Sequence, residues 1–480
     1  MTRALLLAHH LGPSAEVVLV EGEHPGLHWG TGFGLPGVTV HASDALAPRR
    51  GEPGQAGAGA VAALRGLFMS TGLLVAEGDF LPGDGERQLL RETFASDVAL
   101  GAALFNDLEL AWHTARVERL AVRRARGDAL RDEAWVYGLA LDESEAREAG
   151  AGSVSHYLAR WRTGDIALAD FVPALLRRAE AHQLDHLPLD AEDAQEPAPG
   201  IRMRPVRSPT LPPAAHTNMF LVGGSTAVLI EPATPFEDEL DAICEWVEEA
   251  EAAGTHVLAI CATHHHPDHI GGAVALQERL GLPLWGHAKT AEALEGEVYF
   301  DALLEDGQRI ELMLDDDGTM LTLECVHTPG HAWGHLCFFE PSSRALIAGD
   351  MIAGVGSILV EKHDGDMGLY LESLARMKAL GASCLLPAHG GVIVNPEACL
   401  NHYVTHRLAR EEQVAKALDD AGEGTPVDLV PRAYADTPRM LWPLAARALE
   451  AHLIHLHALG RAEDLGDGRY RKTFTTARTP

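Results

Sequence analysis

This chain of 480 residues lacks most of the features that mark secreted, membrane or nucleic-acid-binding proteins. Its six cysteines include no C-x-x-C pair, so we expect buried, reduced thiols in a cytoplasmic protein rather than a disulfide framework. No hydrophobic run approaches the roughly 18 residues that a membrane span needs. Basic residues number 38 against 69 acidic ones, and the net charge of −31 disfavours general binding to nucleic acids or anionic membranes.

Length and apolar content indicate several packed domains. A chain of this size exceeds one ordinary core, so we expect two or three domains. The hydrophobic fraction of 46% suits globular domains and excludes a largely disordered chain. The clearest boundary is residues 191–200, an acidic, proline-containing segment with the composition of a linker. We therefore expect one domain over 1–190, a second over 201–396 and a third over 397–480.

The most informative segment reads T-H-H-H-P-D-H, from Thr263 to His269, and follows an apolar, strand-like run. Imidazole nitrogen and carboxylate oxygen are ligands that suit zinc, iron or manganese. Side chains two apart on an extended segment point the same way, so His264 and His266 can face one ion together. Asp268 and His269 follow around the turn and can face a second ion beside the first.

Three further polar residues each close an apolar, β-type run next to a glycine that lets the backbone turn sharply. They are His331, Asp350 and His389. With the first motif they give seven candidate ligands, five His and two Asp, a number that suits two divalent ions with Asp350 as a carboxylate bridge. We expect Zn²⁺ first, with Mn²⁺ or Fe²⁺ as alternatives.

On these four motifs, in this order, the chain resembles the metallo-β-lactamase superfamily, whose hallmark is T-H-x-H-x-D-H followed by a later His, Asp and His. The resemblance implies one metal on His264, His266 and His331, another on Asp268, His269 and His389, and Asp350 between them. It also implies an αββα sandwich with the metals at one edge of the sheets. One departure is Glu231-Pro232-Ala233, where the superfamily usually has Asp-Pro-Gly; the position lies behind the ligands, so metal binding should survive.

The C-terminal part has the element order of a winged helix. We expect helices over 397–421, 427–434 and 439–459 and a hairpin over 460–476. His406-Arg407 and Arg410-Glu411-Glu412-Gln413 resemble the H-R-x-x-R-E-x-Q helix start of the small domain attached to the β-lactamase-like protein 2 branch. Because the charges here are roughly balanced, we expect a lid or wall over the metal cleft rather than a DNA reader.

The first 190 residues resemble a Nudix domain, whose box is G-x5-E-x7-R-E-U-x-E-E-x-G-U. A strand over 17–20 and a helix over 60–68 supply the pattern. The positions that fit the box are Gly51, Arg65, Leu67, Gly72 and Leu73, and those that replace its glutamates are Gly57, Gly66, Met69 and Ser70. These replacements offer no carboxylate to Mg²⁺, so the resemblance implies a Nudix-like scaffold without Nudix catalysis. An unrelated α/β domain is the alternative, and support, dimerisation or substrate capping are its open roles.

The expected chemistry is metal-assisted hydrolysis. Two ions a few ångströms apart would share a water and lower its pKa from about 15.7 towards 7, so that a bridging hydroxide exists at neutral pH. Asp268 is the candidate catalytic residue, because it could aim that hydroxide by a hydrogen bond while binding its metal. No serine or cysteine nucleophile is required.

The substrate is open among several classes. A small acyl compound, such as a thioester or lactone, suits the acidic chain best. A single-strand endoribonuclease is permitted by the resemblance to the β-lactamase-like protein 2 branch, but the candidate cations Lys362, Arg407 and Arg410 are few. A mononuclear iron dioxygenase of the persulfide type shares H-x-H-x-D-H, although the ligands of a second site count against it. The complete ligand set also argues against a non-catalytic scaffold. The oligomeric state is open, with a homodimer among the options.

Two neighbours of the candidate ligands have bland expected roles. His265 should point away from His264 and His266 and pack or line a pocket, and His335 should hydrogen-bond beside His331. The segment 363–366 follows Asp350 and is expected to be a surface turn, with substrate contact as the alternative.

Overall fold

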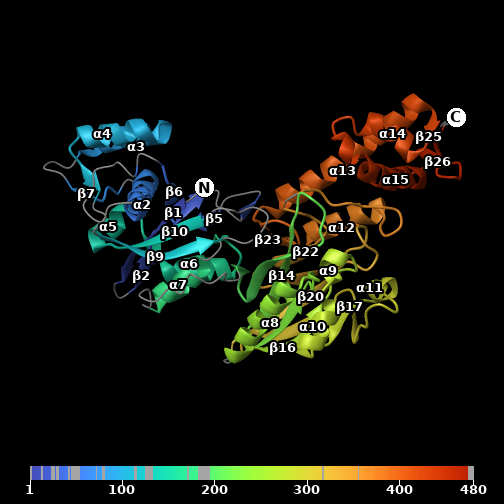
Figure 1. Cartoon of the computed structure of the whole chain (residues 1–480), viewed down its shortest axis with the longest axis horizontal. Helices are drawn as coiled ribbons and strands as arrows, with labels where there is room; N and C mark the ends of the chain where they lie inside the picture. The colour runs from blue at the N-terminus through green and yellow to red at the C-terminus, as the bar shows by residue number, and fades with distance from the viewer. Residues whose placement is uncertain are drawn as a thin grey trace. The chain divides into compact units, whose positions relative to one another are not determined.

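The computed structural model describes residues 3–11, 14–22, 27–28, 32–41, 44, 55–71, 73–77, 82–112, 116–124, 133–169, 172–181, 195–315, 318–354 and 356–473 (Figure 1). The chain forms two compact units, Met1–Arg204 and Pro205–Pro480. Of the expected linker, residues 191–194 lie outside the described residues. Its second half is structured, because Gln195–Ala198 form strand β12 and Glu196 is paired with Arg177.

The first unit is built on a mixed sheet with one long helix packed against it. The sheet has the order β11 (Gly152–Ser153), β2 (Ala15–Val17), β1 (Arg3–Leu11), β10 (Glu133–Ala140) and β9 (Val117–Arg124), and β6 (Gly37–Thr39) also pairs with β1. Helix α2 (Gln55–Thr71) contacts β1 and β6, and its residues 60–68 are buried. The strand expected over 17–20 is interrupted, since β2 ends at Val17 and β3 (Val20–Gly22) begins after it.

The remaining elements of this unit are short. They are β4 (Leu27–His28), β5 (Gly32–Gly34), β7 (Ala76–Glu77), α3 (Asp84–Ser96), α4 (Val98–Asp107), β8 (Ala111–Trp112), α5 (Glu143–Glu148), α6 (Val154–Arg162) and α7 (Val172–Glu180). Two positions of the Nudix comparison, Gly51 and Gly72, lie outside the described residues.

The second unit holds two sheets face to face. The first has the order β13 (Ile201–Arg207), β14 (His216–Gly223), β15 (Thr226–Ile230), β16 (His256–Cys261), β17 (Leu284–His287) and β18 (Ala302–Leu304). The second has the order β19 (Arg309–Met313), β20 (Met320–His327), β21 (Leu336–Glu340), β22 (Ala345–Gly349), β23 (Cys384–Pro387) and β24 (Val392–Ile393). Strands β21, β22 and β23 are buried throughout, as expected for strands covered on both faces.

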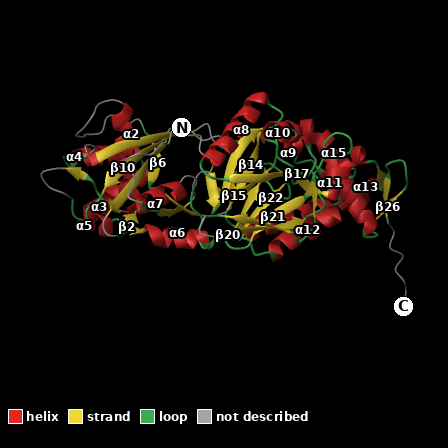
Figure 2. Cartoon of the chain, turned by 90° about the horizontal axis from the view of Figure 1, so that it is seen from below, coloured by secondary structure: helices red, strands yellow, loops and turns green. Residues whose placement is uncertain are grey.

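Helices cover the outer face of each sheet. Helices α8 (Glu237–Ala252) and α10 (Ala273–Leu280) lie on one side, and α12 (Met367–Ala379) lies on the opposite side of the paired sheets (Figure 2). The short helices α9 (Pro267–Ile270) and α11 (Ala288–Ala293) follow β16 and β17. The predicted mixed α/β sandwich is therefore confirmed.

The sheet directions bring the functional loops together. Strands β15 and β16 are parallel, as are β22 and β23, while β20 reaches the direction of β22 through the antiparallel β21. Strands that share a direction end at the same edge of a sheet, and ligands in α/β folds usually bind beyond those carboxyl ends. The loops after β16, β20, β22 and β23 therefore converge.

The C-terminal elements confirm the expected helix and hairpin order. They are α13 (Pro396–Ala421), β25 (Glu423–Gly424), α14 (Pro426–Ala433), the short 3₁₀ helix η2 (Arg439–Leu441), α15 (Trp442–Ala458), β26 (Ala462–Asp464) and β27 (Tyr470–Lys472). Val414 and Leu418 of α13 pack with Leu449 and Leu453 of α15 in one buried cluster. Three helices and a three-stranded sheet around this core have the arrangement of a winged helix.

The six cysteines all lie within the described residues. All six cysteines are free thiols, and five of them are buried. Within the described residues, no helix is both long and apolar enough to cross a membrane.

Candidate metal centre

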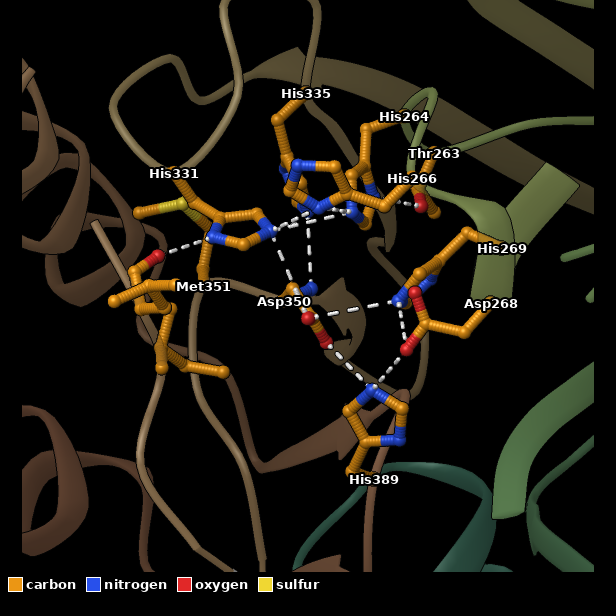
Figure 3. A network of polar contacts seen from close by, with 12 residues as sticks. Thr263, His264, His266, Asp268, His269, His331, His335, Asp350, Met351 and His389 are labelled. Carbon is orange, nitrogen blue, oxygen red and sulfur yellow. Dashed lines mark hydrogen bonds and ion pairs between the residues drawn. The ribbon is translucent and has the colours of Figure 1, made fainter. Parts of the chain in front are cut away.

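The structure brings all seven predicted site residues to one edge of the sandwich (Figure 3). Each follows the end of a strand, because the loop after that strand turns directly at the sheet edge. His264, His266, Asp268 and His269 follow β16, His331 follows β20, Asp350 follows β22 and His389 follows β23.

Three of the histidines form a tight first group. His264 Nε2 lies 2.9 Å from His266 Nδ1, and His331 Nε2 lies 3.2 Å from the former and 2.9 Å from the latter. Burial, reinforced by the neighbouring histidines, lowers the pKa of His264 well below its ordinary value and that of His331 to about 4. The nitrogens of the three imidazoles face one another at separations close to the ~3.4 Å between two nitrogens on a tetrahedral Zn²⁺.

The second group combines a carboxylate with two histidines. Asp268 Oδ2 lies 3.7 Å from His269 Nε2 and 3.5 Å from His389 Nε2. Asp350 lies between the groups: its Oδ1 is 3.3 Å from His389 Nε2, and its Oδ2 is 3.5 Å from His269 Nε2 and 3.6 Å from His331 Nε2. One carboxylate thus faces both groups through its two oxygens.

Two buried atoms at this point have no hydrogen-bond partner, Asp350 Oδ1 and His269 Nε2. A buried polar atom left unsatisfied costs about 1–3 kcal/mol, and a bound ion that contacted both atoms would remove this cost. Burial opposes protonation of His389, but Asp350 and Asp268 outweigh it and raise its pKa to about 10. The carboxylates of the site therefore favour positive charge beside them. The imidazole and carboxylate donors fit two divalent ions of the Zn²⁺, Mn²⁺ or Fe²⁺ type.

Outer hydrogen bonds decide which nitrogen of each imidazole is available. His331 Nδ1 donates to Leu359 O at 2.7 Å, and His389 Nδ1 donates to His216 O at 2.9 Å. A carbonyl can only accept, so both imidazoles carry a proton on Nδ1, which leaves Nε2 to face the centre.

Glu231 orients one histidine of each group. It is fully buried at the end of β15 with φ 69°, and its Oε1 accepts from His269 Nδ1 at 3.0 Å and from Thr263 Oγ1 at 2.8 Å. Because the Thr263 hydroxyl donates its hydrogen bond to Glu231, its oxygen can accept one from His264 Nδ1, at 3.0 Å. The unusual Glu at this position therefore still supports the ligands.

Close packing also fixes the turn that follows Glu231. Gly272 N donates to Pro232 O at 2.9 Å, and a Cβ on Gly272 would lie 2.4 Å from Thr234 O. Only glycine fits there, which explains the glycine that follows the histidine motif.

Asp364 is a site residue that the sequence reasoning missed. We expected a surface turn, and this is wrong for Asp364: its side chain is 14% exposed and hydrogen-bonds His266 Nε2. His265 does not point away from His266 as expected. Its Nε2 lies 3.1 Å from Asp364 Oδ1, and Asp364 also bonds His266. Thr210 Oγ1, 3.5 Å from His389 Nε2, was missed as well. The sequence holds no spacing rule that would place these loops against the motif. His335 is confirmed as a hydrogen-bonding neighbour, because its Nε2 accepts from Asp350 N at 3.0 Å.

Comparison with known proteins identifies relatives of the second unit. Residues 212–389 match the metallo-beta-lactamase superfamily, and residues 425–471 match the beta-lactamase associated winged helix domain. The Beta-lactamase-like protein 2 homolog of Caenorhabditis elegans is 30% identical over 238 residues, which span 48% of this chain and 75% of that protein. The Atrochrysone carboxyl ACP thioesterase of Aspergillus chevalieri is 34% identical over 206 residues, which span 43% of this chain and 61% of that protein. In fold, the chain is similar to a Beta-lactamase domain protein from Burkholderia ambifaria, with a TM-score of 0.50, 23% identity, and coverage of 60% of this chain and 95% of that one.

Proposed function

This chain belongs to the metallo-beta-lactamase superfamily, and we propose that it is a hydrolase with a dinuclear, preferably zinc, centre that cleaves a small acyl substrate such as a thioester or lactone. The observation that supports this most is the position of Asp350. Its oxygens face His331 of the first group and both His269 and His389 of the second, and Oδ1 has no hydrogen-bond partner. A single bound ion would leave that bridging arrangement half used.

The proposed ligands are those of the two groups: His264, His266 and His331 for one ion, Asp268, His269 and His389 for the other, and Asp350 for both. Two ions bound there would supply hydroxide at neutral pH and polarise the substrate carbonyl. The cysteines offer no competing nucleophile, because burial raises the pKa of Cys261, Cys325 and Cys337.

Asp268 is proposed to orient the attacking water. Burial works to raise its pKa, but His269 and His389 outweigh this and hold the pKa well below its usual range. Asp268 therefore stays ionised and can accept a hydrogen bond but not donate one. Its side chain is 16% exposed, so part of the carboxylate remains accessible to solvent. For a thioester, water adds to the carbonyl, the C–S bond breaks, and the products are a carboxylic acid and a thiol.

The choice of an acyl substrate has two supports. One is the thioesterase name of the Aspergillus chevalieri relative, which is 34% identical to this chain over the matched part. The other is the chain's charge of −31, since a small acyl compound does not require a basic groove.

The endoribonuclease alternative needs free cations beside the centre, and the three candidates are engaged elsewhere. Lys362 Nζ binds Glu450 Oε1 at 2.8 Å, Arg407 is buried, and Arg410 binds Asp436 at 3.0 Å. These contacts disfavour RNA. The iron dioxygenase alternative would leave the second group of ligands without a role.

Elemental analysis of the purified, unchelated protein tests the proposal. Near two zinc or manganese ions per chain, with hydrolysis of thioesters or lactones in preference to single-stranded RNA, is the expected result. A single iron, with oxygen-dependent thiol chemistry, would overturn it. Two zinc ions with RNA cleavage and no acyl hydrolysis would keep the centre and replace the substrate.

For the first unit, we propose a Nudix-like scaffold without diphosphatase activity. Arg65, which matches the arginine of the Nudix box, is buried and forms an ion pair with Asp44 at 2.9 Å. It thus has a structural partner in the absence of the box glutamates.

A further inference from the structure

The segment Ile358–Asp364 touches both the first histidine group and the C-terminal helices. We propose that this segment, called the bridging segment below, couples the C-terminal domain to the first metal position, with Arg407 and Arg447 as positioning residues. The inference rests on the proposed metal centre. It gives the winged-helix domain a role in tuning that centre rather than in binding a nucleic acid.

On one side, the bridging segment holds two of the three histidines of the first group. Leu359 O accepts from His331 Nδ1 at 2.7 Å, and Asp364 Oδ2 hydrogen-bonds His266 Nε2. Both contacts lie on the ring nitrogen opposite the one that faces the centre. Such outer partners fix the orientation of an imidazole and raise its basicity, and their loss typically weakens metal binding 10–100-fold.

The chain just beyond Asp364 is pressed against the His331 loop. A Cβ on Gly365 would lie 2.1 Å from Gly330 O, and Asp366 N donates to the same carbonyl at 2.9 Å. The segment cannot shift here without moving the residue next to His331.

On the other side, three contacts tie the bridging segment to the C-terminal domain. Arg407 of α13 donates through Nη2 to Ile358 O, next to the carbonyl that holds His331. Arg447 of α15 pairs with Glu361, and Lys362 pairs with Glu450 of α15 at 2.8 Å. Each of the three contacts joins one residue of the bridging segment to one residue of α13 or α15.

The bridging segment is also packed into a buried core together with α13 and α15. Val360 is fully buried in a cluster that also contains Leu400 and Tyr403 of α13 and Ala451 of α15. Arg407 is 6% exposed and stacks over the Tyr370 ring at 5.1 Å, and Tyr370 Oη donates to Met351 O at 2.7 Å, next to Asp350. A packed core transmits displacement because it has few voids to absorb it.

The two exposed ion pairs give the sharpest test, because exposed pairs add only about 0–1 kcal/mol to stability. The double variant Arg447→Ala/Lys362→Ala removes both links to α15. The matched control is Arg461→Ala/Lys472→Ala, which removes the pairs with Glu412 and Asp419 in the same domain, away from the segment. Zn²⁺ affinity is measured for full-length protein by competition with a chromophoric chelator, alongside thermal unfolding of the metal-free chain.

We expect the double variant Arg447→Ala/Lys362→Ala to weaken one of the two Zn²⁺ affinities about threefold or more, while the control double variant leaves both unchanged. Asp364→Asn should weaken the same affinity about 10–100-fold. Combining it with the double variant should add less than the sum of the separate effects, because both act through one segment. Equal affinities for the test and control pairs would overturn the coupling. If the wild-type chain bound a third Zn²⁺ that Asp364→Asn lost, Asp364 would be a ligand rather than an outer partner, and the coupling would also be overturned. A wild-type chain that binds no metal would refute the proposed function itself.

Discussion

The carboxylate of Glu231 lies 3.0 Å from His269 Nδ1, and both side chains are fully buried. Through the Thr263 hydroxyl the same carboxylate also reaches His264, in the other histidine group. One buried charge therefore sets the orientation of a ligand in each proposed metal position. The relationship links the end of β15 to the motif after β16, which are adjacent parallel strands.

Glu231→Gln keeps the side-chain volume and removes the charge that receives these hydrogen bonds. We expect both Zn²⁺ affinities to fall, by about 10–100-fold, because the outer partner of His269 and the acceptor of Thr263 are weakened together. Chelator competition measures this. Glu340→Gln, another buried Glu bonded to Ser343, is the matched control and should leave both affinities unchanged. A Glu231→Gln protein with wild-type affinities would remove Glu231 from the support of the centre.

Asp350→Ala should lose metal from both positions, because its two oxygens face both groups. We expect turnover of a thioester substrate to fall by more than about 100-fold, beyond what loss of an outer-shell partner causes. His266→Ala should affect the first position most and lower turnover similarly. Metal content per chain and initial rates measure both effects, with Asp306→Ala as an exposed control. Full turnover in either variant would place that residue outside the site.

Metal binding should release protons at neutral pH, and the second group should supply them. Burial opposes the charge on His389 and His269, but the surrounding carboxylates outweigh it and raise the pKa of the former to about 10 and that of the latter well above its ordinary value. The lowered pKa values of His264 and His331 mean that these two histidines have no proton to lose. We expect release of about two protons per chain near pH 7 and metal loss from the second group first as pH falls.

The same shift sets the stability of the metal-free chain. The folded-state pKa of His389, about 10, exceeds its unfolded value of ~6.5, so its protonation stabilises the metal-free fold fully below pH ~6.5. This contribution is lost as pH rises through about 10.

Calorimetry of metal binding in two buffers with different ionisation enthalpies measures the proton release. No buffer dependence at pH 7 would contradict the predicted protonation of the second group.

Gly66→Ala should destabilise the first unit. A Cβ on Gly66 would lie 3.0 Å from the Gly37 Cα, a backbone atom that cannot turn aside as a side chain could. The overpacking of about 1–3 kcal/mol should therefore exceed the gain of about 1 kcal/mol in helix propensity. Thermal unfolding compares it with Ser70→Ala, an exposed position on the same helix. A stabilised Gly66→Ala protein would show that the approach of α2 to β6 is loose.

The same contact bears on Nudix chemistry. Gly66→Glu with Met69→Glu should not restore diphosphatase activity, because two further carboxylates would still be absent and the first has no room beside Gly37. Release of phosphate or nucleotide from a diphosphate substrate by this double variant would contradict that expectation.

The sequence alone determined which residues gather at the sheet edge. Each of the seven candidates follows an apolar strand with a turn residue beside it, and such local patterns are sufficient to place side chains at strand ends. The sequence also predicted the helix and hairpin order at the C-terminus. These features depend on periodicity and turn chemistry, which act over a few residues.

Only the tertiary structure decided what lies behind the ligands. Glu231, Leu359 and Asp364 support histidines that are 38, 28 and 98 residues away along the chain, and no local pattern encodes such partners. The expectation of a surface turn at Asp364 was wrong because that loop folds back onto the histidine motif. Likewise, Arg407 was predicted as a candidate for RNA contact, yet packing buries it against Ile358 and Tyr370. The donors of the centre are thus local in sequence, whereas the contacts that orient them arise from the packing of distant segments.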